Sequence, residues 1–172
     1  MIRLRDETVP FQNRTTYRRC PAPNLPPIGN DDPGVEVTKQ RLTLGRRAEK
    51  ICRRRLWWAG WKILDSNWHT SFGEIDLIAI ERRTLVFVEV KSAGPGWPER
   101  PGPERPVLAV DPAKQSRLTR LAEAWLATEG ISGRVPSKVQ DVRFDVVGIV
   151  FGEDGSVAAW EHLRDAFRAE GS

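Results

Sequence analysis

The amino-acid sequence predicts an α/β domain with a central mixed β-sheet flanked by α-helices. Three patterns support this fold class. An amphipathic helix pattern comes first, two apolar runs separated by a polar tetrapeptide follow it, and a second helix pattern precedes another apolar run. Helix, strand, β-hairpin, helix and strand in this order fit one sheet that carries helices on its faces.

Composition sets the limits for function. With 172 residues, of which 40% are hydrophobic, the chain suits one domain with appendages. A net charge of +4 and a pI near 9.4 permit a polyanionic partner. Cys20 and Cys52 lie far apart, outside any CxxC motif, and are expected to be reduced thiols. No apolar run has the length of a membrane span or the pattern of a signal peptide, so a cytoplasmic location is expected.

Residues 1–38 are expected to form a flexible arm rich in proline and arginine. Six of the thirteen prolines lie here, and proline interrupts both helices and sheets. The arginines of this segment are able to contact phosphates, and the alternative is a solvated tail without a role. The folded domain is then expected to cover residues 39–172.

The first helix is predicted from about Thr38 to Ala59, because apolar residues recur there at three- and four-residue spacing. Its other faces are basic and include Arg46, Arg47 and Lys50. Such a run is either a solvated helix face or a phosphate-binding surface, and both interpretations stay open. Glu49 is the lone acid in this segment. Residues 60–64 then predict a turn and the first strand.

The most informative stretch runs from Gly73 to Lys91, where two apolar runs flank the turn 81–84. A turn centred between residues 82 and 83 pairs residues whose numbers sum to 165, which places Asp76 opposite Glu89. Since side chains alternate along a strand, Lys91 lies on the same face as Glu89.

Two carboxylates so close repel each other unless a cation lies between them, so the pattern indicates a metal site with a lysine beside it. The alternative is an ordinary network of cross-strand ion pairs. The uniformly apolar neighbours favour the first interpretation, because a sheet with one solvated face alternates polar and apolar residues.

The second half of the chain completes the sheet. A Gly/Pro-rich loop is expected over 93–110, and a helix is expected to begin at Asp111-Pro112, with Asp111 as the N-cap, and to end near Gly130. Arg143–Val150 predicts another strand, in which Asp145 is expected either to pair with a nearby arginine or to cap the sheet edge. Trp160–Phe167 is expected to be a strand followed by a helix.

Several motifs resemble a known family in order and spacing. They are LGRRAEKICRRRL, GWKILDSNW, GEIDLIAI, LVFVEVK, AVDPAKQSRLTRLAEAWL and RFDVVGIV, and they cover most of residues 42–150. Together they resemble the YraN (UPF0102) family of small bacterial proteins. The Asp, gap and Glu-x-Lys pattern resembles the PD-(D/E)xK nucleases, and the family is similar in fold to archaeal Holliday-junction resolvases. The resemblance implies a restriction-endonuclease-like fold for 39–172.

The resemblance and the ligand preference of the ion together imply a site for Mg²⁺, or Mn²⁺, formed by Asp76, Glu89, the Val90 carbonyl group and Glu49. Lys91 would orient the attacking water and offset charge on the phosphate. Gln115 or Lys114 would assist from the second helix. The residues expected to contact nucleic acid are Arg46, Arg47, Lys50, Lys114 and Arg117.

The expected function is therefore that of a Mg²⁺-dependent nuclease-like protein acting on structured nucleic acid, with DNA favoured over RNA. The alternative is a nucleic-acid-binding protein that keeps the fold without the chemistry. A third interpretation is a protein–protein adaptor that uses the tryptophan-rich surface. By analogy with junction-cutting nucleases, the chain would act as a homodimer.

Overall fold

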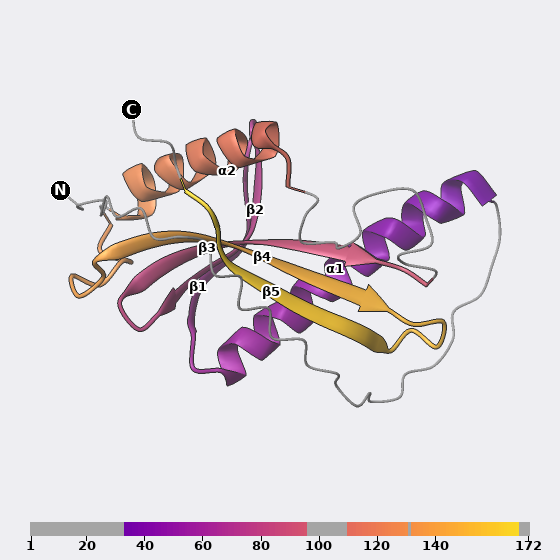
Figure 1. Ribbon diagram of the computed structural model, residues 1–172. Coiled ribbons are helices and arrows are strands. Elements are labelled where there is room, and N and C mark those ends of the chain that lie inside the picture. Colours follow the sequence, from indigo (N-terminus) through magenta and orange to yellow (C-terminus); the bar gives the residue numbers. More distant parts are fainter. Residues whose placement is uncertain (1–32, 96–109, 131, 169–172) are drawn as a thin grey trace.

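The computed structural model describes residues 33–95, 110–130 and 132–168, which form one mixed sheet with a helix against each face (Figure 1). This arrangement confirms the α/β fold class. The elements in chain order are α1 (Pro33–Trp58), β1 (Lys62–Thr70), β2 (Gly73–Glu81), β3 (Thr84–Ala93), α2 (Pro112–Trp125), a π-helical turn (Leu126–Gly130), β4 (Asp141–Phe151) and β5 (Val157–Phe167).

The strands lie in sequence order, β1-β2-β3-β4-β5. Neighbouring strands are antiparallel except β3 and β4, which run parallel. A parallel pair needs a crossover connection, and α2 provides it. The single crossover makes the sheet mixed, as the sequence predicts.

Each helix buries one apolar core against the sheet. The core under α1 contains Ala48, Cys52, Leu56, Trp61, Leu77, Ala79, Val86, Val88, Val147, Ile149 and Phe151. The core under α2 contains Ile75, Ile78, Ile80, Leu85, Phe87, Leu118, Leu121, Ala122, Trp125, Val139 and Phe144. Burial on both faces explains why the strands read as nearly continuous apolar runs.

The β2–β3 hairpin has the register that the sequence predicts. Five pairs, from Leu77–Val88 to Glu81–Thr84, all have numbers that sum to 165. The turn consists of Arg82 and Arg83 alone, and Arg82 has a positive φ of 57°. A left-handed residue at this point lets a two-residue turn follow the twist of the strands.

β2 is bent at the point where the candidate site lies. Ile75 and Ile78 both pack in the core under α2, although residues three apart point to opposite faces of a regular strand. On the neighbouring strand, Asn67 has a positive φ of 55° between the paired residues Ser66 and Trp68. Figure 1 shows the result, because the far part of the β1–β2 hairpin rises beside α2.

The first helix is longer than predicted. α1 begins at Pro33 rather than at about Thr38, so residues 33–38 belong to the helix and not to the predicted arm. Proline is well tolerated in the first turn of a helix, where its missing N–H costs nothing. The rest of the arm, residues 1–32, and most of the predicted loop, 96–109, lie outside the described residues. Among the described helices, none combines the length and the apolar character needed to cross a membrane.

The prediction of a helix at the end of the chain is wrong, because β5 continues as a strand to Phe167. The Asp165 backbone N–H donates a hydrogen bond of 3.0 Å to the Asp145 carboxylate, and the register with β4 shifts at this point. Phe167 then pairs with Phe144, and their rings stack at 4.7 Å. A buried carboxylate on the neighbouring strand therefore holds this segment in the sheet.

Candidate functional site

Asp76 and Glu89 are buried acids on neighbouring strands. Their exposed fractions are 8% and 4%, which is unusual for carboxylates. The regular β2–β3 pairs end at Leu77 and Val88, one step before these two residues. Beyond them, the Val90 backbone N–H donates a hydrogen bond of 2.6 Å to the Asp76 Oδ2 atom. The bend in β2 thus turns the Asp76 side chain toward the strand that carries Glu89.

The electrostatics of Asp76 show that the two acids influence each other. Burial, and next the nearby Glu89 carboxylate, raise the pKa of Asp76 from 3.8 to about 7. The hydrogen bond from Val90 and the charge of Lys114 act in the opposite direction, while the charge of Glu49 adds to the rise. A buried negative pair of this kind favours a cation between its members.

The two oxygens of Glu89 differ in their surroundings. Oε1 accepts contacts from the Lys91 Nζ atom at 2.9 Å and the Lys114 Nζ atom at 3.0 Å. Oε2 is buried and has no hydrogen-bond partner in the part of the chain that the structure describes. A buried oxygen without a partner is costly, and a bound cation would satisfy it.

The donor atoms fit a small divalent cation. The Asp76 carboxylate, Glu89 Oε2 and the Val90 carbonyl group are oxygen donors, and Mg²⁺ prefers oxygen ligands with water completing its shell. Glu49, the expected further ligand, instead accepts a hydrogen bond of 2.6 Å from the Asn67 side chain. Accordingly, within residues 33–95, 110–130 and 132–168 no three acidic, histidine or cysteine side chains converge closely enough to bind a metal together.

Of the two candidate residues on the second helix, Lys114 is the one that contacts the site. The Asp111 side chain accepts a hydrogen bond of 2.8 Å from the Lys114 backbone N–H and caps α2, as predicted. Lys114 in this first turn then binds Glu89. The Gln115 side chain instead donates to the Val110 carbonyl group at 3.1 Å.

The residues expected to contact nucleic acid fall into two groups. Arg46 and Lys50 are exposed on α1. The Arg47 Cζ atom lies 5.0 Å from the centroid of the Phe151 ring, so this side chain also stabilises the packing of α1. Lys114 and Arg117 lie on α2 and line a groove next to the Asp76 and Glu89 pair.

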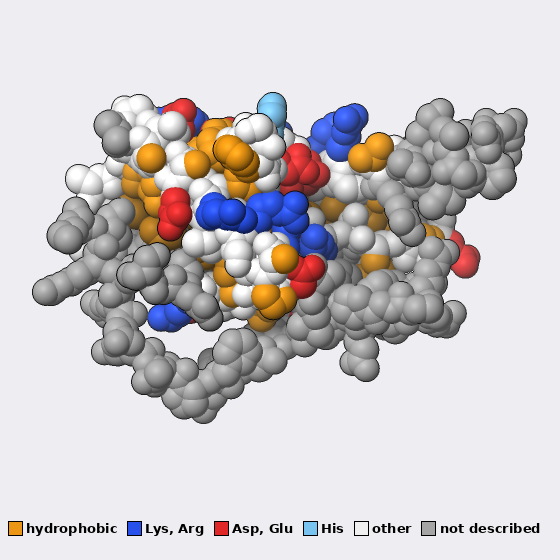
Figure 2. All heavy atoms as spheres, turned by 90° about the horizontal axis from the view of Figure 1, so that it is seen from above, with side chains coloured by type: hydrophobic (Ala, Val, Ile, Leu, Met, Phe, Trp, Pro, Cys, Tyr) orange, Lys and Arg blue, Asp and Glu red, His pale blue; other side chains and the backbone are white. Residues whose placement is uncertain are grey.

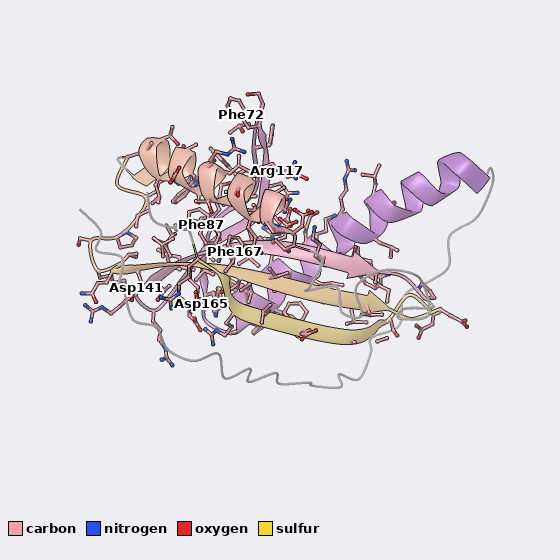
Figure 3. The ribbon with its side chains drawn as sticks, turned by 45° about the horizontal axis from the view of Figure 1, so that its top comes forward. Phe72, Phe87, Arg117, Asp141, Asp165 and Phe167 are labelled. Atoms are coloured by element: carbon pink, nitrogen blue, oxygen red, sulfur yellow. The ribbon has the colours of Figure 1, made fainter. Side chains whose placement is uncertain are left out.

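This groove has a volume of about 350 Å³ and shares Lys114 with the site. Its lining consists of His69, Thr70, Gly73, Glu74, Lys114 and Arg117. Figure 3 places Phe72 at the tip of the β1–β2 hairpin with Arg117 below it, and the Phe72 side chain is 80% exposed. On the face seen in Figure 2, which carries α2, basic and acidic side chains lie next to each other.

Sequence reasoning missed the groove because its two walls come from segments about forty residues apart. The available signal was Phe72, a large apolar residue in an otherwise polar turn. The His69 Nδ1 atom, on the wall of the groove, lies 3.2 Å from the Asn67 carbonyl oxygen. The pairing of Asp145 with an arginine is confirmed, because the Arg143 Nε atom donates to it at 2.7 Å.

Comparison with known proteins confirms the family that the motifs of this chain resemble. The family described as "Uncharacterised protein family UPF0102" matches residues 48–149. A UPF0102 protein of Rhodococcus jostii strain RHA1 is 45% identical over 127 residues, which are 73% of this chain and 97% of the relative. One from Streptomyces griseus is 40% identical, with 72% and 95% covered, and one from Syntrophotalea carbinolica is 37% identical, with 78% and 99% covered. The chain therefore belongs to the UPF0102 family.

Proposed function

We propose that this protein is a nuclease-like phosphodiester hydrolase that depends on Mg²⁺, or Mn²⁺, and acts on structured nucleic acid, with DNA favoured. The observation that carries the proposal is the buried Glu89 Oε2 atom beside the Asp76 carboxylate, for which the described residues provide no hydrogen-bond partner. Burial and the nearby Glu89 carboxylate raise the pKa of Asp76, and a cation between the two carboxylates would offset their repulsion.

Asp76, Glu89 and the Val90 carbonyl group would hold the cation. When bound, the cation supplies an oriented, acidified water and neutralises charge on the phosphate. Glu49 on α1 would become a further ligand once its hydrogen bond with Asn67 breaks. It lies close enough for its charge to raise the pKa of Asp76.

Lys91 is the residue best suited to face the phosphate. It binds Glu89 Oε1, yet 28% of its side chain stays exposed, so its amine can contact both the site and an approaching substrate. There it would orient the attacking water and offset the negative charge that develops on the phosphate oxygens. Lys114 is 21% exposed and binds the same oxygen, which places a second positive charge beside the first.

The groove next to the site supports a nucleic-acid substrate. Arg117 and Lys114 on its wall can contact backbone phosphates. Phe72 above the groove offers a flat apolar surface on which an unpaired base can stack. Unpaired bases occur at branches and single-stranded ends, so the groove favours such substrates over a plain duplex.

The direct test is cleavage of branched DNA, single-stranded DNA and RNA with Mg²⁺ or Mn²⁺. We expect Asp76→Asn, Glu89→Gln and Lys91→Met each to reduce cleavage by roughly a hundredfold or more, because each removes charge that acts on the transition state. Glu123→Gln on the exposed side of α2 is the matched control and should cleave like wild type. Absence of cleavage by wild type, or cleavage that survives Asp76→Asn, contradicts the proposal.

A second candidate function is nucleic-acid binding without hydrolysis. The observation that favours it is the pair of lysines on Glu89 Oε1, because Lys91 and Lys114 already neutralise this acid without a metal. Binding measured across a salt series separates the two candidates. Affinity that falls steeply with salt, together with no turnover in either metal, supports the second candidate.

A further inference from the structure

A second polar pocket lies at the turn between β2 and β3. It has a volume of about 390 Å³, and its lining consists of Glu81, Arg82, Arg83, Thr84, Arg143 and Arg164. Glu81 lies five residues after Asp76 on β2, a separation of about 17 Å along an extended strand. Figure 3 shows Asp141, the partner of Thr84 in the β3–β4 register, well away from Arg117 and Phe72.

Two of the arginines are held by acidic partners and by the buried Trp61 ring. Arg143 donates to Asp145 from its Nε atom at 2.7 Å and to Glu81 from its Nη2 atom at 2.9 Å. Arg164 binds the same Glu81 oxygen. Both guanidinium groups lie over the buried Trp61 ring, and the Cζ atom of each is 5.8 Å from the ring centroid. Their positions are therefore set before any ligand arrives, which lowers the cost of binding one.

The other two arginines, Arg82 and Arg83, are expected to lower the stability of the folded chain. Arg82 has a φ of 57°, in a turn that favours asparagine and glycine. Arg82 and Arg83 are exposed neighbours of like charge, and the described residues provide no ion pair for either. The turn requires a left-handed residue but not an arginine, and backbone strain of this kind is a feature of binding sites.

Charge accumulates in this pocket. Four guanidinium groups line it against the single carboxylate of Glu81. Counting Asp145, which binds Arg143 from the protein side, there are still four positive charges against two negative ones. A tetrahedral oxyanion fits this setting, because guanidinium groups pair with phosphate oxygens through two parallel hydrogen bonds.

We propose that this pocket binds a phosphate group, with Arg82 and Arg83 closing on it and Arg143 and Arg164 forming its floor. The phosphate belongs either to a nucleic-acid backbone or to a free phosphate monoester, and both offer the same oxygens. The inference does not rest on the hydrolysis proposed above, because it involves neither the metal site nor cleavage.

The test is titration of the full chain with inorganic phosphate, followed by calorimetry and by amide NMR shifts, with EDTA present. We expect saturable binding to wild type, with shifts at Arg82, Arg83 and Thr84. The double variant Arg82→Asn, Arg83→Gly should bind roughly tenfold or more weakly, because it loses two charged hydrogen-bonding groups. Arg53→Gln, Arg54→Gln, which removes another adjacent exposed pair on α1, is the matched control and should bind like wild type.

Unfolding in urea provides the second measurement. Arg82 has a positive φ and Arg83 does not, so the single variant Arg82→Asn relieves the turn and should unfold at a higher urea concentration while it binds phosphate less well. Absence of saturable phosphate binding to wild type, equal binding by the double variant, equal loss in the control, or a lower urea midpoint in Arg82→Asn each overturns the proposal.

Two further ligands identify the source of the phosphate. Equal affinities for inorganic phosphate, thymidine 5′-monophosphate and short oligothymidylate indicate a free monoester. Tighter binding of oligothymidylate that the double variant loses indicates a nucleic-acid strand. Either result supports the pocket as a phosphate site.

Discussion

The Asp76 carboxylate takes the place of a backbone acceptor for Val90, since its Oδ2 atom accepts the Val90 N–H at 2.6 Å just beyond the last regular β2–β3 pair. This contact ties an acid of one strand to the strand that carries Glu89. The site is therefore part of the hairpin itself, and a change in its charge should change the free energy of unfolding.

Replacing Asp76 with asparagine should stabilise the metal-free protein. The amide oxygen can still accept the Val90 N–H, while the buried charge beside Glu89 disappears. At about pH 8 in EDTA we expect the free energy of unfolding to rise by about 2 kcal/mol. In Mg²⁺ wild type should gain stability and the variant should not, as measured by urea unfolding. Asp141→Asn at the exposed start of β4 is the control, and a loss of stability in Asp76→Asn contradicts the expectation.

Removing Lys114 should make the protein more dependent on a divalent cation. Lys114→Met leaves Glu89 with Lys91 as its one remaining lysine, and this should cost about 1–3 kcal/mol in EDTA. The shift in melting temperature on adding Mg²⁺ should then exceed that of wild type, because the cation replaces the lost charge. Arg120→Met, an exposed change on the same helix, should respond to Mg²⁺ like wild type.

Stability should fall in mild acid because of Asp145 and Glu81. Burial raises the pKa of Asp145, but hydrogen bonds from His162 and Arg143 outweigh it and hold the pKa below 3.8. For Glu81, burial likewise opposes Arg164 and Arg143, whose hydrogen bonds hold the pKa below 4.5. The unfolded chain therefore binds protons first as the pH falls.

The contribution of these two acids is present above their ordinary pKa values and is lost below about pH 4. Urea unfolding from about pH 7 to about pH 3 measures the loss. Glu81→Gln should show a flatter pH dependence than wild type, because one of the two groups no longer titrates. Wild-type stability that stays constant over this range would show that neither acid is held by its partners.

Freeing Glu49 should strengthen metal binding. Asn67 adopts a positive φ and holds Glu49 at 2.6 Å, so Asn67→Gly keeps the backbone conformation and removes the hydrogen bond. We expect a lower Kd for Mn²⁺ by calorimetry, by roughly threefold to tenfold. Glu49→Gln should raise the Kd, and adding Asn67→Gly to it should change nothing more. An unchanged Kd in Asn67→Gly would remove Glu49 from the ligand set.

Cys52 should be unreactive in the native protein. Its side chain is fully buried between α1 and the sheet, and burial, followed by the charge of Asp76, raises the pKa of its thiol. In a Cys20→Ser background we expect no reaction with a thiol reagent until urea unfolds the chain. Rapid labelling of the folded protein would show that α1 separates from the sheet.

The hairpin could be predicted because its rules are local. Once the turn is centred between Arg82 and Arg83, the period of two along a strand fixes the pairs from Leu77–Val88 to Glu81–Thr84. The same alternation places Lys91 beside Glu89, whereas the predicted pair of Asp76 with Glu89 lies beyond the last regular pair. The cap of α2 was predictable for the same reason, since Asp111 and Pro112 act within one turn.

What the sequence could not reveal depends on contacts between distant segments. The bend in β2 follows from packing against α2, and no period in residues 73–81 reports it. Asn67 holds Glu49, and Lys114 reaches Glu89, across gaps that no spacing rule covers. The end of β5 shows the same limit, because Asp145 on another strand overrides the helical appearance of the segment.

Lys91 and Lys114 meet at one oxygen of Glu89, so the chain segment between them leaves and returns at nearly the same place. The length of that segment can then change during evolution with little penalty, since doubling a loop costs only about 0.6 kcal/mol. Insertions there can add new contacts for a substrate or partner while the two lysines still contact Glu89. A change in chain length between these two lysines should therefore leave their contacts with Glu89 in place.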